Sequence, residues 1–290
     1  MPGSDSGSSS RSSSPPLQLD PSTLAALSSF YDERAEADRQ FQELEKKAHE
    51  RLVAAQEQGR DAVWSRLGNR NRNRLTMVDG PNQLEPEPIM SVDEFRKLFG
   101  EDWQLSQFWY SASFATRFSR FLYSLCNPNT RIAFLSCPTA YIGFQHENPL
   151  RDAWLWEYDT RFKLVAGDKF VHYNLEEPEA YPEELRGTVD IAIADPPFLN
   201  EVTNRYFATT LRSLLKPNGK LLLLTSTSVS SVLPKVYTEA PVGPLRRTTV
   251  EVEHAGGRLQ NDFACWASWE FQDQDGVKSL EVERGAAEMA

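Results

Sequence analysis

A carboxylate, two prolines and an aromatic ring follow one another in Asp195-Pro196-Pro197-Phe198, directly behind the apolar run at 189–194 (VDIAIA). The run is short, rich in β-branched residues and continuous, which is typical of a central parallel strand buried on both faces. Neither proline can donate to a ladder, so the strand must end here. The sequence therefore predicts a carboxylate and a ring in a stiff turn at a strand's carboxyl end, where open α/β sheets carry their sites.

This D-P-P-F tetrapeptide resembles the motif of methyltransferases that use S-adenosylmethionine and act on a planar or primary amine. The resemblance implies that the Asp195 side chain and the following carbonyl accept hydrogen bonds from the target nitrogen, while the Phe198 ring packs against its carrier. The predicted catalytic residues are Asp195, Pro196, Pro197 and Phe198. The alternative is a plain loop boundary, because Pro-Pro often does no more than end a strand.

The elements around this motif alternate between strands and helices. Apolar runs at 131–136, 153–158, 170–173 and 220–225 indicate strands, and 201–215 has its apolar residues at helical spacing. A crossover helix between strands implies parallel neighbours. The runs at 248–253 and 263–271 alternate in polarity, which indicates an antiparallel hairpin. The predicted fold class is α/β, Rossmann-like, with a mostly parallel sheet and a C-terminal antiparallel hairpin, the layout of class I methyltransferases.

A cofactor site of the dinucleotide type needs a turn after the first strand and an acidic residue about 20 residues further on. The turn, at 136–140, contains no glycine, although glycine normally allows the backbone to approach such a ligand. Asp159 is the candidate for the ribose hydroxyls, with Glu157 in reserve on the same strand face, and a solvated strand end is the alternative for each. Asn174 is a candidate for the adenine edge, or a turn asparagine. The predicted cofactor contacts are Ser136, Cys137, Pro138, Thr139, Glu157, Asp159, Asn174 and Asp195.

Four blocks carry a closer resemblance: W-Q-L-S-Q-F-W-Y-S at 103–111, E-Y-D-T-R-F at 157–162, A-D-P-P-F-L at 194–199 and N-D-F at 261–263. In this order they resemble the eukaryotic elongation factor 1-alpha lysine methyltransferases, in a fungal-type form. That family was formerly labelled as adenine-specific DNA methyltransferases because of the shared D-P-P-[FY]. The resemblance implies a class I enzyme that uses S-adenosylmethionine, has no metal and modifies one lysine of translation elongation factor 1-alpha in the cytoplasm.

The aromatic block at 103–111 could form a wall for a cationic target, because cation–π contacts contribute about 0.5 to 2 kcal/mol. It could equally be core that packs an entry helix on the sheet. Phe108 fits the core interpretation better. The predicted substrate contacts are Trp103, Gln104, Tyr110 and Phe198.

Charge argues for a protein substrate. The chain has 31 Lys and Arg against 41 Asp and Glu, a net charge of −10, whereas duplex binding depends on phosphate neutralisation by a basic face. Direct nucleic-acid binding is therefore not expected. The arginines of 66–74 (RLGNRNRNR) are the one basic patch, which we interpret as a solvated linker, with contact to the partner or its bound RNA as the alternative.

Composition divides the chain into four parts. Residues 1–20 form a Ser-rich lead that should be disordered. Residues 21–100 form a helical arm, one amphipathic helix over about 24–58, followed by a Pro-rich linker and a capping box at Ser91 and Glu94. The methyltransferase domain spans 101–271, and 272–290 is a charged tail. We expect a monomer.

The three cysteines have no metal spacing, and neither a signal-peptide core nor a membrane-length apolar run is present. These features indicate a reduced intracellular protein. Three functions remain open: a protein lysine methyltransferase, an adenine methyltransferase on DNA or RNA, and a binding module of the same fold without catalysis. The third is favoured by the glycine-free turn.

Overall fold

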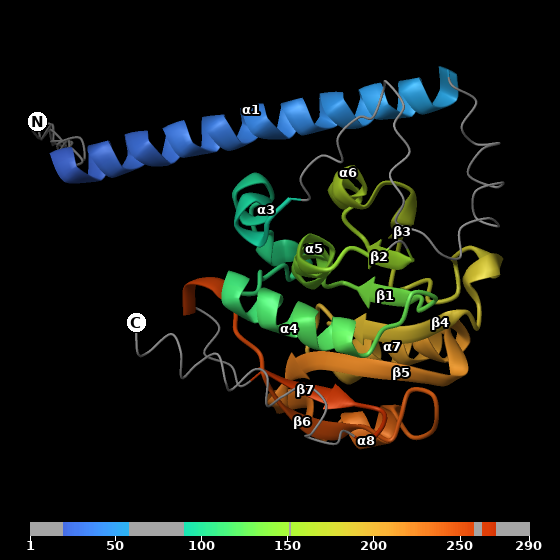
Figure 1. Cartoon of the computed structure of the whole chain (residues 1–290). Helices are drawn as coiled ribbons and strands as arrows, with labels where there is room; N and C mark the ends of the chain where they lie inside the picture. Colours follow the sequence, from blue (N-terminus) through green and yellow to red (C-terminus); the bar gives the residue numbers. More distant parts are fainter. Residues whose placement is uncertain (1–19, 58–89, 151, 258–262, 271–290) are drawn as a thin grey trace, which may run out of the picture. The chain divides into compact units, whose positions relative to one another are not determined.

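The computed structural model describes residues 20–57, 90–150, 152–257 and 263–270 (Figure 1). The predicted disordered lead, the arginine-rich segment at 66–74, the Pro-rich linker and the charged tail lie outside these residues. The described chain divides into two units at 43/44, inside helix α1 (Pro21–Glu57). A helix was predicted over about 24–58, and the observed helix begins three residues earlier and ends at Glu57.

The second unit is built on a seven-stranded sheet with the order β3-β2-β1-β4-β5-β7-β6. Its strands are β1 (Ile132–Leu135), β2 (Ala153–Glu157), β3 (Phe170–His172), β4 (Val189–Ala194), β5 (Leu215–Ser226), β6 (Arg246–Glu251) and β7 (Phe263–Ala267). Strands β1 to β5 are parallel, and β7 runs antiparallel to both β5 and β6. This sheet confirms the predicted Rossmann-like α/β fold with its terminal antiparallel pair.

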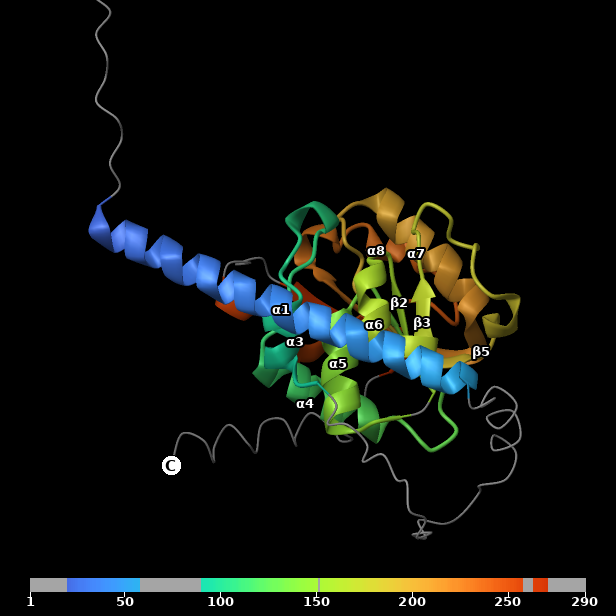
Figure 2. The same ribbon diagram turned by 90° about the horizontal axis from the view of Figure 1, so that it is seen from above.

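Helices cover both faces of the sheet (Figures 1 and 2). On one side lie α3 (Val92–Leu98), α4 (Ala112–Ser124) and α5 (Pro138–Glu147), and on the other α7 (Glu201–Leu214) and α8 (Leu233–Val236); α6 (Lys163–Ala166) is a single turn between β2 and β3. Phe134 packs on α5, whereas its neighbours Ala133 and Leu135 join the cluster under α7. Alternate residues of each central strand thus face opposite helical layers, which explains why these strands are apolar throughout.

Local signals set several element boundaries as expected. The capping box opens α3, with the Ser91 side chain accepting from the Glu94 backbone and Glu94 accepting from the Ser91 backbone. Asn200 caps α7 through its side chain. In the part of the chain that the structure describes, no helix is long and apolar enough to cross a membrane.

The terminal hairpin differs from the prediction in its first strand, which was placed at 248–253. Strand β6 starts two residues earlier and ends at Glu251, and the residues after it leave β7 for a different partner. Ser111 donates its backbone N–H to the carbonyl of Glu253, and Tyr110 forms an isolated antiparallel bridge with His254. The aromatic block is thereby attached to the C-terminal edge of the fold.

Candidate functional site

Three neighbouring strands end at one level on the sheet. Leu135 of β1 is opposite Trp156 of β2 and Ala194 of β4, so the next residues along, Ser136, Glu157 and Asp195, come out side by side. The strand order changes direction at this point, because β2 and β3 follow on one side of β1 and β4 and β5 on the other. Open α/β sheets bind ligands at such a switch point.

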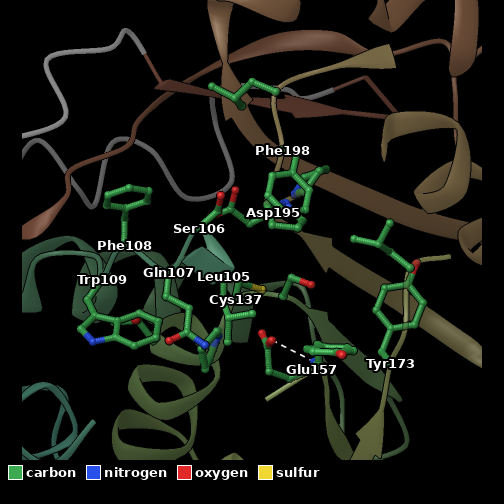
Figure 3. A pocket seen from close by; sticks show the side chains of 18 of the residues that line it. Leu105, Ser106, Gln107, Phe108, Trp109, Cys137, Glu157, Tyr173, Asp195 and Phe198 are labelled. Carbon is green, nitrogen blue, oxygen red and sulfur yellow. Dashed lines mark hydrogen bonds between the residues drawn. The ribbon is translucent and has the colours of Figure 1, made fainter. Parts of the chain in front are cut away.

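A cavity of about 340 Å³ occupies this position (Figure 3). The predicted site residues that line it are Tyr110, Ser136, Cys137, Pro138, Thr139, Glu157, Asn174, Asp195, Pro196, Pro197 and Phe198. Asp159, Trp103 and Gln104 do not line it. The lining also includes Leu105, Ser106, Gln107, Phe108, Trp109, Tyr158, Tyr173, Leu175, Glu176, Leu199, His254 and Phe263.

Asp195 stands at the end of β4, where its backbone N–H donates to the Leu135 carbonyl at 3.0 Å. Its Oδ2 accepts a hydrogen bond from the Tyr110 hydroxyl. Among the described residues no other side chain bonds this carboxylate, so Oδ1 can receive a ligand. Burial raises the pKa of Asp195 to about 7, and the hydrogen bond from Tyr110 acts against that rise.

Phe198, three residues on, lies at the cavity's edge with 44% of its surface exposed. The stiff Pro-Pro turn therefore holds a carboxylate inside the cavity and a ring at its rim.

Glu157 is the second carboxylate of the cavity. It ends β2, is 7% exposed, and its Oε1 accepts the backbone N–H of Tyr158 at 2.9 Å (dashed in Figure 3). Burial raises the pKa of Glu157 to about 7, since its backbone hydrogen bonds only partly offset the cost of desolvation. A buried carboxylate with an oxygen still open is suited to accept hydrogen bonds from the hydroxyls of a ligand.

Asp159 was predicted to bind ribose hydroxyls, but in the structure its carboxylate bonds to side chains of the protein. Its two oxygens accept from the Arg161 guanidinium at 2.6 to 3.0 Å, and Oδ2 also accepts from Gln107 Nε2 at 3.0 Å. Burial acts to raise the pKa of Asp159, but the bonds from Arg161 and Gln107 outweigh it and lower the pKa. The carboxylate is thus engaged within the protein.

Gln107 is the residue through which Asp159 affects the cavity. Its side chain is buried, and because Nε2 is bonded to Asp159, the amide orientation is fixed. Its Oε1 is buried and has no hydrogen-bond partner among the residues that the structure describes. An unpaired buried acceptor costs about 1 to 3 kcal/mol unless a donor meets it, so a cavity-lining residue with this property indicates a ligand that donates a hydrogen bond there.

The glycine-free turn has the backbone geometry that glycine usually provides. Ser136 has φ of 54°, in the left-handed region, and its N–H donates to the Trp156 carbonyl at 2.9 Å. The chain then enters α5 with Pro138 in its first turn, a position where proline's missing N–H costs nothing. Ser136 thus adopts a backbone conformation that favours glycine, although the turn contains none.

The aromatic block divides into three environments. Trp103 and Gln104 lie on the exposed 3-10 turn Trp103–Leu105 outside the cavity, and their contact with a protein substrate stays a prediction. Tyr110 is 1% exposed and lines the cavity. Phe108 is only partly buried and also lines it, so the assignment of Phe108 to the core is wrong. The ring follows Gln107 toward the cavity, while Trp109 takes the core position against Phe95 and Phe162.

Asn174 lines the cavity, and its Oδ1 accepts the Glu176 backbone N–H at 3.1 Å. The turn role and a ligand role are compatible, since the side-chain Nδ2 is not used in that turn.

Twelve of the lining residues were not among the predicted site residues, and His254 and Tyr158 are two of them. His254 packs its ring against Tyr110 and Phe263, with centroids 5.2 and 4.6 Å apart, and burial lowers its pKa to about 4. Tyr158 follows Glu157 at the end of β2. Only Tyr158 had a local signal, its place directly after a strand-end carboxylate. Among the described residues, no group of three or more His, Cys, Asp or Glu side chains could hold a metal ion.

Comparison with known sequences gives a consistent set of relatives. The family model described as "Probable N6-adenine methyltransferase" matches residues 101–271. The protein-lysine N-methyltransferase EFM5 of Saccharomyces cerevisiae is 38% identical over 194 residues, 61% of this chain and 76% of that protein. The protein-lysine N-methyltransferase M142.8 of Caenorhabditis elegans is 33% identical over 206 residues, 68% and 90% of the two chains. EEF1A lysine methyltransferase 1 of Bos taurus is 31% identical over 212 residues, 66% and 89%.

Among solved structures, a fibrillarin of Aeropyrum pernix with bound S-adenosyl-L-methionine aligns with a TM-score of 0.37 at 16% identity, over 54% of this chain and 76% of that one.

Proposed function

We propose that this chain, which belongs to the family described as probable N6-adenine methyltransferases, methylates a lysine of translation elongation factor 1-alpha. The curated relatives above are protein-lysine N-methyltransferases. The methyl donor is S-adenosylmethionine. The observation that carries the proposal is that Asp195 and Glu157 share one cavity at the switch point of the sheet. In this proposal Asp195 orients the amine and Glu157 binds the cofactor.

The protein substrate is favoured over adenine by two observations. The curated relatives from Saccharomyces cerevisiae and Caenorhabditis elegans are named as protein-lysine N-methyltransferases. The relative from Bos taurus is named as an EEF1A lysine methyltransferase. The net charge of −10 opposes a polyanionic substrate at long range. The D-P-P-F motif alone would suit either nitrogen, because both are amines that need an oriented acceptor.

The cavity residues fit the cofactor. Glu157 supplies a carboxylate for the two ribose hydroxyls, and Asn174 lines the neighbouring wall, suited to the adenine edge. The unpaired Oε1 of Gln107 supplies an acceptor for a cofactor amine. The left-handed φ of Ser136, in the first turn of the cavity, supports cofactor binding over a binding module without cofactor. S-adenosylmethionine supplies an electrophilic methyl group on a sulfonium.

On the other side of the cavity the chain must receive a lysine as a neutral amine, because the ammonium, with a pKa near 10.4, is no nucleophile. A partly buried site and a nearby positive charge both lower that pKa. Asp195 Oδ1 and the carbonyl after it accept the N–H groups of the amine and thereby orient its lone pair. Phe198 packs on the methylene stem. Catalysis depends chiefly on proximity and orientation.

The remaining parts of the chain have roles consistent with this substrate. Helix α1 is an arm that can add contact area with the factor, and Trp103, 62% exposed, can contact the same partner. The substrate's location makes the cytoplasm the compartment of action. The enzyme acts as a monomer in this proposal, because one chain supplies both sides of the cavity.

The test is a transfer assay with S-adenosylmethionine labelled in the methyl group. The purified full-length chain is incubated with purified elongation factor, and separately with single-stranded and duplex DNA and with RNA. The expected result is label on the factor, located on one lysine by mass spectrometry, and no label on nucleic acid. Asp195→Ala should lower the single-turnover rate by about 100- to 1000-fold, as for losing one preorganised polar group.

Tyr237→Phe is the matched control, because it removes a buried side-chain hydrogen bond to Asn204 away from the cavity. Its rate should equal that of the parent. Label on adenine instead of lysine, or full activity in Asp195→Ala, would contradict the proposal.

A further inference from the structure

The Tyr110 hydroxyl is the group that holds Asp195 in place. It donates to Oδ2 of Asp195 from a side chain that is 1% exposed. The Tyr110 ring packs edge-on against Phe114 of α4 at 5.1 Å and against the His254 ring at 5.2 Å, and its backbone bridges to His254. Ring and backbone are fixed from both sides, so the hydroxyl has little freedom to leave the carboxylate.

Asp195 faces titratable groups from each element packed around it. Tyr110 precedes α4, Cys137 begins the turn into α5, and Glu157 ends β2, while His254 reaches the same wall after β6. Burial, then the charge of Asp195, raise the pKa of Tyr110 well above its ordinary value, and burial followed by Asp195 does the same for Cys137. Burial keeps His254 neutral. Tyr110 is therefore a lasting donor at neutral pH, and no described neighbour supplies a positive charge.

We propose that Tyr110 is a positioning residue, which binds Oδ2 so that Oδ1 of Asp195 faces the target amine and which favours the ionised form of Asp195. This inference rests on the proposed lysine methylation. Asp195 orients the amine only when ionised, because a protonated carboxyl would offer a donor where the amine needs an acceptor.

Its consequence is a specific dependence of the reaction on pH. Burial places the pKa of Asp195 at about 7 with the Tyr110 bond present. Removing one hydrogen bond to a charged acceptor should raise that pKa further, by about one to two pH units. Because the carboxylate is the active form, a higher pKa of Asp195 must move the acidic limb of the pH–rate profile to higher pH.

The experiment compares Tyr110→Phe with the parent in single-turnover methylation of the elongation factor from pH 6 to 9.5. Cofactor and factor are saturating, so that Glu157 is covered by cofactor and the profile reports groups in the complex. We expect the acidic limb to move up by about one to two units, with a rate about 5- to 50-fold lower at pH 7. The two rates should converge above pH 9.

Tyr237→Phe is again the control, since it removes a buried tyrosine hydroxyl that does not line the cavity; its profile should match the parent. In an Asp195→Asn background, which removes the ionisation of residue 195, Tyr110→Phe should cause no shift. A fluorinated tyrosine at position 110 provides a second variant that keeps the ring, and its stronger donor should move the limb to lower pH.

The inference is overturned if Tyr110→Phe lowers the rate equally at every pH, or if the fluorinated variant leaves the limb unmoved. Failure of the proposed function is separate, because the parent itself would then fail to label the factor.

Discussion

Glu157 and Asp159 are two residues apart in the sequence, yet their carboxylates have different surroundings and opposite pKa shifts. Glu157 lines the cavity with burial raising its pKa to about 7, whereas Asp159 is bonded to Arg161 and Gln107, and its pKa is lowered despite the opposing effect of burial. In our proposal Glu157 binds a ligand, whereas Asp159 is bonded within the protein. Substitutions at the two positions should therefore have opposite effects on the free energy of unfolding above neutral pH.

Cofactor affinity should depend on Glu157 directly. We expect Glu157→Gln to weaken S-adenosylmethionine binding by about 10- to 150-fold, because charge-assisted bonds to hydroxyls contribute about 1.5 to 3 kcal/mol. Calorimetry with the full-length chain measures this. Asp159→Asn should have a smaller effect, transmitted through Gln107. If Asp159→Asn weakened binding more than Glu157→Gln, the ribose role would belong to Asp159 after all.

In the absence of cofactor, Glu157→Gln should raise the free energy of unfolding at pH 8, whereas Asp159→Asn should lower it. Because Glu157 binds its proton more tightly in the folded chain than the usual value of 4.5, the folded state holds more protons between about pH 4.5 and 7, and stability falls as pH rises through that window. Glu157→Gln removes this loss and should raise the free energy of unfolding at pH 8 by up to about 3 kcal/mol. At pH 4 the two proteins should be alike.

Asp159→Asn is the matched change, with the opposite sign. A carboxylate with a lowered pKa stabilises above its unfolded value of 3.8 and loses that contribution as pH falls. At pH 8 we expect a loss of about 1 to 2 kcal/mol, discounted because Arg161 is partly exposed. Urea unfolding of both variants at pH 4 and 8 checks the pair, and stabilisation by Asp159→Asn would refute the assignment.

The turn at Ser136 should be strained by its side chain. A non-glycine residue in the left-handed region costs about 1 to 2 kcal/mol, whereas glycine loses more chain entropy on folding, about 0.5 to 1 kcal/mol. Ser136→Gly should thus raise the free energy of unfolding by about 0.5 to 1 kcal/mol, and Ser136→Val, β-branched, should lower it. Destabilisation by Ser136→Gly in urea unfolding would show that the serine side chain contributes more than it strains.

The sequence predicted the sheet well because its central strands are buried on both faces, and continuous apolar runs such as 189–194 have few other interpretations. It put Asp159 before Glu157 as the ribose candidate, whereas of the two only Glu157 lines the cavity. Strand alternation puts both on one face, but β2 ends at Glu157 and a 3-10 turn begins at Thr160, so the alternation no longer applies at Asp159. The sequence did not reveal the left-handed φ of Ser136, because residue type alone does not determine φ. His254 was missed since its position depends on pairing with Tyr110, far away in sequence.

Phe198 should determine how well the target lysine is held. Its ring is 44% exposed at the cavity rim, so Phe198→Ala should leave stability unchanged while lowering kcat/KM for the elongation factor by about 2- to 30-fold, the range of a lost cation–π or stem contact. Phe198→Tyr keeps the ring face and should be tolerated. Cofactor affinity should not change in either variant.

Val202→Ala is the control for this change, because Val202 is a more exposed apolar residue nearby on α7 that does not line the cavity.

The Phe198 variants also distinguish a lysine substrate from an adenine substrate. A ring that stacks on a flipped base would make the parent, but not Phe198→Ala, sensitive to adenine-containing competitor oligonucleotides. A ring that lines a lysine channel gives no inhibition in either protein. Inhibition of the parent that Phe198→Ala abolishes would therefore reassign the cavity from lysine to adenine.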